Sequence, residues 1–161
     1  MTRIVGVVGR KNGGKTGLVE RLVGVLAARG LEVATMKNAH HDARLDVPGT
    51  DSDRHRRAGA ARVLLATPEG WAMTGGAPEG PEALARRLAG ADVVLAEGFK
   101  AAPWPKIEAW RPECREGPLA PAHGIAAVAS TGAPQVPLPV LPLDDTEALA
   151  GFALKLAVRL L

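Results

Sequence analysis

The chain has 161 residues, of which 47% are apolar, and a formal net charge of +3 at pH 7. This size and apolar content are typical of one compact core, so we expect a single nucleotide-binding domain over residues 1–161. A lone cysteine, Cys114, excludes an intramolecular disulfide, and no apolar stretch reaches the roughly 20 residues of a membrane-spanning helix. Three Trp, two Phe and no Tyr give no stacking surface for nucleic acid. We therefore expect a cytoplasmic protein that binds neither membrane nor nucleic acid.

Strands and helices alternate along the first half of the chain. Residues 4–8 are a short apolar run, which predicts a buried strand. Helical spacing of apolar residues begins after Gly14 and ends near Gly30. The following elements are expected to be a strand over 32–36, a helix over 51–58 with Asp51 as its N-cap, hairpin strands over 62–67 and 71–74, and a helix over 81–89.

The second half continues the alternation. It predicts strands over 93–96, 106–110, 125–129 and 140–141, a loop or edge excursion over 111–123, and a final helix that begins at Asp144 or Asp145 with an apolar face reaching Leu160. Such alternation favours an α/β fold of the P-loop NTPase type, with a doubly wound, mainly parallel sheet, helices on both faces and an antiparallel or edge excursion. Ligands of such sheets bind beyond the carboxyl ends of the strands.

The segment between the first strand and helix carries a phosphate-binding motif. Residues 9–16 read Gly-Arg-Lys-Asn-Gly-Gly-Lys-Thr and fit G-x-x-x-x-G-K-[ST]. Glycines let backbone N–H groups surround phosphate oxygens at a helix N-terminus, Lys15 adds a charge, and the Thr16 hydroxyl ligates Mg²⁺. A plain strand-to-helix turn needs neither side chain. The predicted nucleoside triphosphate site comprises Asn12, Gly13, Gly14, Lys15, Thr16 and Gly17.

Glu97 follows the apolar strand 93–96, at the edge where the phosphate loop is expected. An acid at this position serves as a direct or water-mediated partner of Mg²⁺. We predict that Glu97 and Thr16 form the metal site. The alternative is a surface carboxylate paired with Lys100.

Lys37 ends the second predicted strand at the same edge and precedes His40, His41 and Asp42. Lys37, Asp42 and Asp51 are candidates for groups that sense the γ phosphate or a metal-bound water. The two histidines with Asp42 also suggest zinc, although adjacent strand residues point to opposite sides. A plain solvated loop, and for Asp51 an ordinary capped helix, are the alternatives.

Further motifs, in their order and spacing, extend over nearly the whole chain. They are Lys37 with His40-His41-Asp42, Pro48-Gly49-Thr50-Asp51-Ser52, Arg57-Ala58-Gly59-Ala60, Trp71-Ala72, Glu97-Gly98-Phe99-Lys100, Pro105-Lys106-Ile107-Glu108 and Ala127-Val128-Ala129-Ser130. With them the chain resembles the molybdopterin-guanine dinucleotide biosynthesis adaptor family, MobB. The resemblance implies a GTP-binding protein with slow hydrolysis, usually a homodimer, that assists the guanylyltransferase attaching GMP to molybdopterin. It also implies that Lys15 and Thr16 hold phosphate and Mg²⁺ and that Glu97 is the Walker-B acid.

Two functional hypotheses follow. The first is this GTP-binding adaptor, with no predicted catalytic residue. The second is a small-molecule kinase built on the same phosphate loop. Arg86 and Arg87 lie in a predicted helix, but no segment between Gly76 and Gly90 has the Arg-rich pattern of a kinase lid. Because no Asn-Lys-x-Asp guanine motif is present, the residues themselves predict a triphosphate, and only the resemblance implies GTP.

Overall fold

The computed structural model describes residues 1–39 and 46–160 of the chain. It divides into two compact units, one formed by Met1–Asn38 with Pro81–Leu161 and the other by Ala39–Gly80. Each unit is described by itself below. Among the described residues, no helix has the length and apolar character needed to cross a membrane.

The larger unit is built on a seven-stranded sheet within the described chain, in the order β2-β5-β1-β6-β7-β8, with β9 also paired to β1. All pairs along this order are parallel, and only β9 runs antiparallel to its neighbour, which confirms the mainly parallel α/β fold. The strands are β1 (Arg3–Val8), β2 (Val33–Lys37), β5 (Val93–Glu97), β6 (Lys106–Trp110), β7 (Ile125–Ser130), β8 (Val140–Pro142) and β9 (Val158–Arg159).

Two apolar layers cover the two faces of this sheet. On one face, Val5 and Val7 of β1 pack in a cluster with Leu18 and Leu22 of α1 (Lys15–Ala28) and with α4 (Thr146–Leu156). On the other face, Ile4 packs in a cluster with residues of α3 (Pro81–Arg86) and of the segment after β5. Successive side chains of β1 thus point alternately into the two apolar layers, as expected for a doubly wound sheet.

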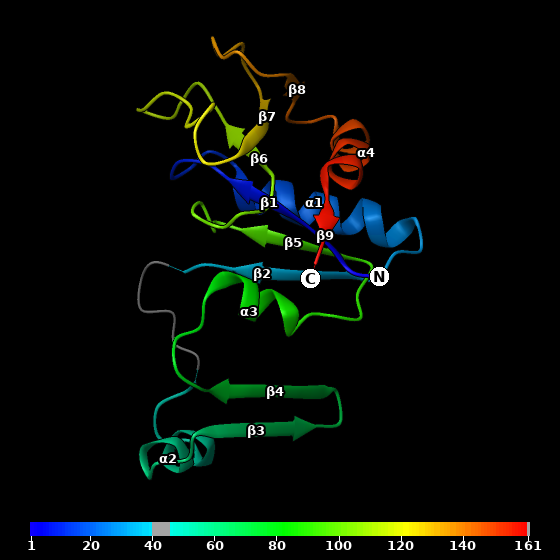
Figure 1. The fold of residues 1–161 in the computed structure, drawn as a ribbon. Coiled ribbons are helices and arrows are strands. Elements are labelled where there is room, and N and C mark those ends of the chain that lie inside the picture. The colour runs from blue at the N-terminus through cyan, green and yellow to red at the C-terminus, as the bar shows by residue number, and fades with distance from the viewer. Residues whose placement is uncertain (40–45, 161) are drawn as a thin grey trace. The chain divides into compact units, whose positions relative to one another are not determined.

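The parallel register brings the carboxyl ends of three strands to one edge. Val7 of β1 and Lys37 of β2 both lie opposite Glu97 of β5. In Figure 1 the arrowheads of β1, β2 and β5 accordingly point the same way. The loop that joins β1 to α1 leaves the sheet at this edge, as predicted.

The chain end differs from the prediction of one helix reaching Leu160. The final helix, α4, begins after Asp145, whose Oδ1 accepts a hydrogen bond from Ala148 N over 3.0 Å, and it ends at Leu156. Ala157 is extended, and β9 then pairs with the first residues of β1. This pairing satisfies backbone groups at the start of β1, because β6 pairs only with the later part, from Gly6 to Val8.

The smaller unit contains α2 (Asp51–Arg57) and a two-stranded antiparallel ribbon of β3 (Arg62–Thr67) and β4 (Gly70–Gly75). The predicted hairpin is therefore present. The predicted N-cap of α2 is wrong by one residue, since the cap is Thr50, whose hydroxyl accepts a hydrogen bond from Asp53 N. Thr50 has the extended backbone that a capping residue needs, and Asp51 is already helical.

Candidate functional site

The loop between β1 and α1 lies tightly against the end of β6. A Cβ on Gly9 or Gly13 would lie 2.2 or 2.5 Å from the Ala109 carbonyl oxygen, so neither position accommodates a side chain without a shift of the backbone. Asn12 has a φ of 63°, which asparagine tolerates better than most residues. The sequence of this loop is therefore adapted to a fixed, closely packed path.

The N-terminus of α1 is free of side-chain caps. Gly14 occupies the N-cap position with a left-handed backbone (φ 93°) and no side-chain hydrogen bond, and the first turn contains no acidic residue. The first N–H groups of a helix have no partner within the helix, and the helix dipole gives this end a partial positive charge. The arrangement is that of an anion-binding site.

Lys15 directs its ammonium group back over the loop. Its Nζ donates a hydrogen bond to the Arg10 carbonyl oxygen over 2.7 Å. Burial lowers the pKa of Lys15, and the nearby charges of Lys100 and Lys37 act in the same direction, whereas Glu97 opposes the shift. Several cations thus surround the phosphate loop, and an anion bound there would relieve their mutual repulsion.

Thr16, Lys37 and Glu97 come from three different elements and meet at one point. The Thr16 hydroxyl donates to Glu97 Oε1 over 3.0 Å. Lys37 Nζ lies 3.2 Å from the same carboxylate oxygen and 3.3 Å from Thr16 Oγ1. Glu97 is nearly buried, with its side chain 9% exposed, whereas that of Lys37 is 57% exposed. The predicted alternative of a Glu97 to Lys100 pair is not the ion pair found, because Glu97 pairs with Lys37.

This cluster fits a magnesium ion. Mg²⁺ takes oxygen ligands at 2.0–2.1 Å in an octahedron, so that adjacent ligands lie about 2.9 Å apart. Thr16 Oγ1 and Glu97 Oε1 have close to that separation. Two protein oxygens leave the other octahedral positions to phosphate and water oxygens. Among residues 1–39 and 46–160, no group of three or more His, Cys, Asp and Glu side chains could hold a metal ion. A cavity of about 370 Å³ between α1 and β2 adjoins the same three residues.

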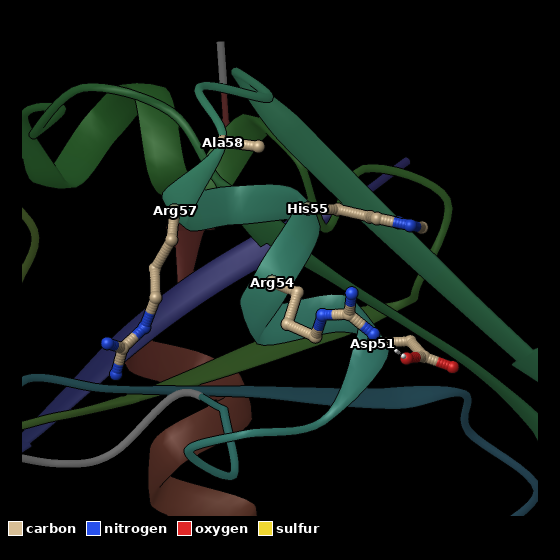
Figure 2. Close-up of a pocket in the computed structure, with 5 residues that line it drawn as sticks. All are labelled: Asp51, Arg54, His55, Arg57 and Ala58. Atoms are coloured by element: carbon tan, nitrogen blue, oxygen red, sulfur yellow. Dashed lines mark hydrogen bonds and ion pairs between the residues drawn. The ribbon is translucent and has the colours of Figure 1, made fainter.

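Of the other two acidic residues predicted near the nucleotide, the structure describes Asp51 but not Asp42. Asp42 lies outside the described residues together with His40 and His41, so the predictions for them stay predictions. Asp51 belongs to the smaller unit, where its carboxylate is exposed and Arg54 Nη1 lies 3.4 Å away. Figure 2 shows Arg54 turned toward Asp51, with Arg57 extending in another direction beside a surface pocket. The role of Asp51 near a nucleotide also stays a prediction.

Asp53 is an acidic residue of α2 that the sequence analysis missed. It is 2% exposed, accepts a hydrogen bond from Gly49 N over 3.0 Å, and pairs with Arg56 and Arg57 at 2.7 and 2.8 Å. The Gly49 N–H and these guanidinium groups hold the pKa of Asp53 below its ordinary value, against the effect of burial. Arg56 and Arg57 follow Asp53 by three and four residues, a spacing that predicts ion pairs on one face of a helix.

Two buried charged residues of β6 belong to a motif of the family resemblance, but no role was predicted for either. Lys106 is 1% exposed, and its ammonium group donates to the carbonyl oxygens of Ala102, Trp104 and His123. Glu108 is fully buried and accepts hydrogen bonds from Leu119 N and Ala120 N at 2.7 and 2.8 Å. Both fix the path of the chain around β6. Charged residues at alternate positions of an otherwise apolar strand were the signal for them.

Comparisons with known proteins agree with this architecture. The family model of molybdopterin guanine dinucleotide synthesis protein B matches residues 4–131. The molybdopterin-guanine dinucleotide biosynthesis adapter protein of Escherichia coli K12 is 35% identical over 150 residues, which cover 88% of this chain and 86% of that protein. The adapter protein of the same name from Haemophilus influenzae is 39% identical over 114 residues, 68% of this chain and 64% of that protein.

Solved structures show the same fold. The crystal structure of Bacillus subtilis MobB aligns with a TM-score of 0.76 at 24% sequence identity, over 97% of this chain and 98% of that one. A crystal structure titled molybdopterin-guanine biosynthesis protein B aligns with a TM-score of 0.67 at 24% identity, over 95% and 99% of the two chains.

Proposed function

The chain belongs to the family of molybdopterin guanine dinucleotide synthesis protein B, and from this premise we propose that it binds GTP with Mg²⁺ as an adapter in molybdopterin guanine dinucleotide biosynthesis. The meeting of Thr16, Lys37 and Glu97 at the uncapped end of α1 is the observation that supports it most strongly. Relatives in Escherichia coli and Haemophilus influenzae carry the name of adapter proteins of this biosynthesis.

In the proposed site, backbone N–H groups, the Lys15 ammonium group and a metal ion each contact the phosphates of the nucleotide. The free N–H groups of α1 and the loop hold the phosphate oxygens, and Lys15 exchanges its contact with the Arg10 carbonyl oxygen for the β and γ phosphates. Thr16 and Glu97 are the residues that hold Mg²⁺, which neutralises phosphate charge when bound. The proposal that the base is guanine rests on the family alone.

The proposed partner is the guanylyltransferase that joins GMP to molybdopterin, in the cytoplasm. We also propose a homodimer, which an apolar patch on the ribbon of the smaller unit supports. Leu64 pairs in register with Met73, and Trp71 lies beside them on the same face; these side chains are 60%, 47% and 72% exposed. An exposed patch of this kind favours contact with another protein surface.

One experiment separates the adapter from the small-molecule kinase. The wild-type protein is titrated with GTP and ATP with and without Mg²⁺ in a calorimeter, and labelled GTP is then incubated with a panel of small hydroxyl and amine acceptors. Preferential, Mg²⁺-strengthened binding of GTP without transfer to any acceptor is expected. Rapid phosphoryl transfer to an acceptor would favour the kinase, and absence of triphosphate binding would overturn both. Lys15→Ala, with its fold checked by circular dichroism, is the control for binding at the phosphate loop.

A further inference from the structure

The loop after β6 forms a second wall against the phosphate loop. Arg10 Nη1 pairs with Glu116 Oε2 at 2.6 Å, and Arg10 Nε donates to the Gly117 carbonyl oxygen over 3.3 Å. Cys114 Sγ lies 3.8 Å from the Lys11 carbonyl oxygen. Segments about 100 residues apart in the sequence are therefore held side by side within the larger unit. Side chains at the start of this second loop lie at the anion site.

Arg111, the first residue after β6, is positioned against the N-terminus of α1. A Cβ on Gly14 would lie 3.0 Å from Arg111 Nε and 3.4 Å from both Cζ and Nη2. Gly14 is the N-cap residue of α1, so the guanidinium lies beside the free N–H groups of that helix. The absence of a side chain at Gly14 is what permits this approach.

Within residues 1–39 and 46–160, the guanidinium of Arg111 has no ion pair with a carboxylate. Its Nε is buried and has no hydrogen-bond partner within residues 1–39 and 46–160, and the described ion pairs of this region join other residues, such as Arg10 with Glu116. A buried, unpaired donor of a charged group is costly, so its presence in a native site calls for a partner such as water, an ion or a ligand. The geometry next to Gly14 indicates that this ligand is an anion.

We infer that Arg111 is a direct ligand of the phosphates of the bound nucleotide, an inference that rests on the proposed function of the phosphate loop. The planar guanidinium fork donates to two phosphate oxygens at once, which a lysine ammonium does not reproduce. Arg111 and Lys15 together bring two cations to the β and γ phosphates, from the two walls of the site. The Arg10 to Glu116 pair and the Glu108 hydrogen bonds position the loop that carries Arg111.

The test compares Arg111→Ala, Arg111→Lys and the matched control Arg115→Gln, an exposed arginine four residues along the same loop. Each variant and the wild type are titrated calorimetrically with GTP, GDP and GMP in Mg²⁺, and thermal unfolding is followed by circular dichroism. Arg111→Ala is expected to weaken GTP and GDP binding about 10- to 100-fold, because hydrogen bonds between charged groups are lost. GMP binding is expected to change much less, and Arg111→Lys is expected to lie between wild type and Arg111→Ala.

The outcomes separate this inference from the proposed function. Normal GTP binding by Arg111→Ala would overturn the role in phosphate binding. An equal loss for GTP and GMP would overturn the contact with the β and γ phosphates, because GMP has neither. Lower thermal stability with unchanged ratios of GTP to GMP affinity would assign Arg111 a structural role and also overturn the inference. If the wild type binds no triphosphate, the proposed function itself fails. Arg111→Lys keeps the charge and the stem of the side chain, so it supplies the answer if the alanine variant does not fold.

Discussion

The hydroxyl of Thr16 and the carboxylate of Glu97 lie 3.0 Å apart, although 81 positions separate the two residues in the sequence. Thr16 is the second residue of α1 and Glu97 is the last residue of β5, so the contact depends on the parallel register that places β5 beside β1. Lys37, the last residue of β2, contacts both oxygens. Its ammonium group therefore neutralises the carboxylate that is proposed to hold Mg²⁺.

Glu97→Gln is expected to weaken Mg²⁺-dependent GTP binding roughly tenfold, and to change binding in EDTA much less. The amide keeps the shape and one acceptor oxygen but removes the charge that attracts the metal. Calorimetric titration of GTP with Mg²⁺ and with EDTA measures both affinities. Glu32→Gln, an exposed carboxylate at the opposite end of β2 from Lys37, is the matched control. Equal losses with and without Mg²⁺ would contradict the metal role of Glu97.

Lys37→Gln is expected to strengthen binding of a divalent cation to the nucleotide-free protein about two- to fivefold. The ammonium group and the metal compete for Glu97, and a partly exposed ion pair is worth up to about 1 kcal/mol. Titration with Mn²⁺ as a paramagnetic substitute, followed by electron paramagnetic resonance, measures this affinity. Weaker Mn²⁺ binding in the variant would show that Lys37 supports the metal site instead of competing with it.

The sequence was sufficient to predict the parts of the site that lie at strand ends. The apolar run before Glu97 and the pattern around Lys15 and Thr16 place these residues at one edge of a parallel sheet, and the structure brings them together there. Strand length, apolar content and glycine position are local properties, so a single sequence reveals them. Lys37 could be placed at the same edge by the same argument, and its pairing partner follows from the β2 to β5 register.

Other features depend on contacts that local patterns do not encode. Arg111 looked like one charged residue of a polar loop, and its place beside Gly14 follows from the packing of that loop on β6. The final residues kept helical apolar spacing through Leu160, yet the chain leaves the helix because the first residues of β1 need a partner strand. Backbone groups at the start of β1, which β6 leaves unpaired, outweigh a weak helical preference over a few residues.

Glu108→Gln is expected to destabilise the fold by about 1–3 kcal/mol and to weaken GTP binding to a smaller extent than Arg111→Ala. The carboxylate is buried and accepts two backbone hydrogen bonds, and a glutamine side chain supplies one acceptor oxygen and places an NH₂ group against an N–H donor. Urea unfolding and GTP titration measure the two effects. Glu113→Gln, an exposed residue of the same loop, is the control. An unchanged unfolding midpoint would show that the loop does not depend on Glu108.

Replacing Trp71 by Ser is expected to shift the protein toward monomer if the ribbon patch joins two copies of the chain. The exposed indole supplies much of the apolar area of the patch, and large aromatic residues carry a disproportionate share of interface free energy. Sedimentation velocity over a range of protein concentrations measures the change. Trp104→Phe, at a buried position of the larger unit, is the matched aromatic control. A wild-type protein that sediments as a monomer at all concentrations would contradict the proposed homodimer.

The stability of α2 is expected to depend on pH through Asp53. The N–H of Gly49 and the charges of Arg56 and Arg57 lower the pKa of Asp53 in the folded state. The stabilisation is therefore fully present above the unfolded-state pKa of about 3.9 and is lost as pH falls through the lower, folded-state value. Asp53→Asn is expected to increase hydrogen exchange of the segment around α2 at pH 7, with a difference from wild type that shrinks toward pH 3.

Mass spectrometry of exchanged peptides, corrected for intrinsic rates, measures this difference. Asp51→Asn is the control, because the Asp51 carboxylate is 88% exposed and, among the residues that the structure describes, pairs with Arg54 alone at 3.4 Å. Its replacement is therefore expected to change exchange little. Equal exchange of Asp53→Asn and wild type at pH 7 would show that another interaction holds α2 in place. Protonation of Asp53 removes the same two ion pairs that Asp53→Asn removes, so the two proteins should become more alike in hydrogen exchange as pH falls. A difference in exchange that grows as pH falls would contradict the lowered pKa of Asp53.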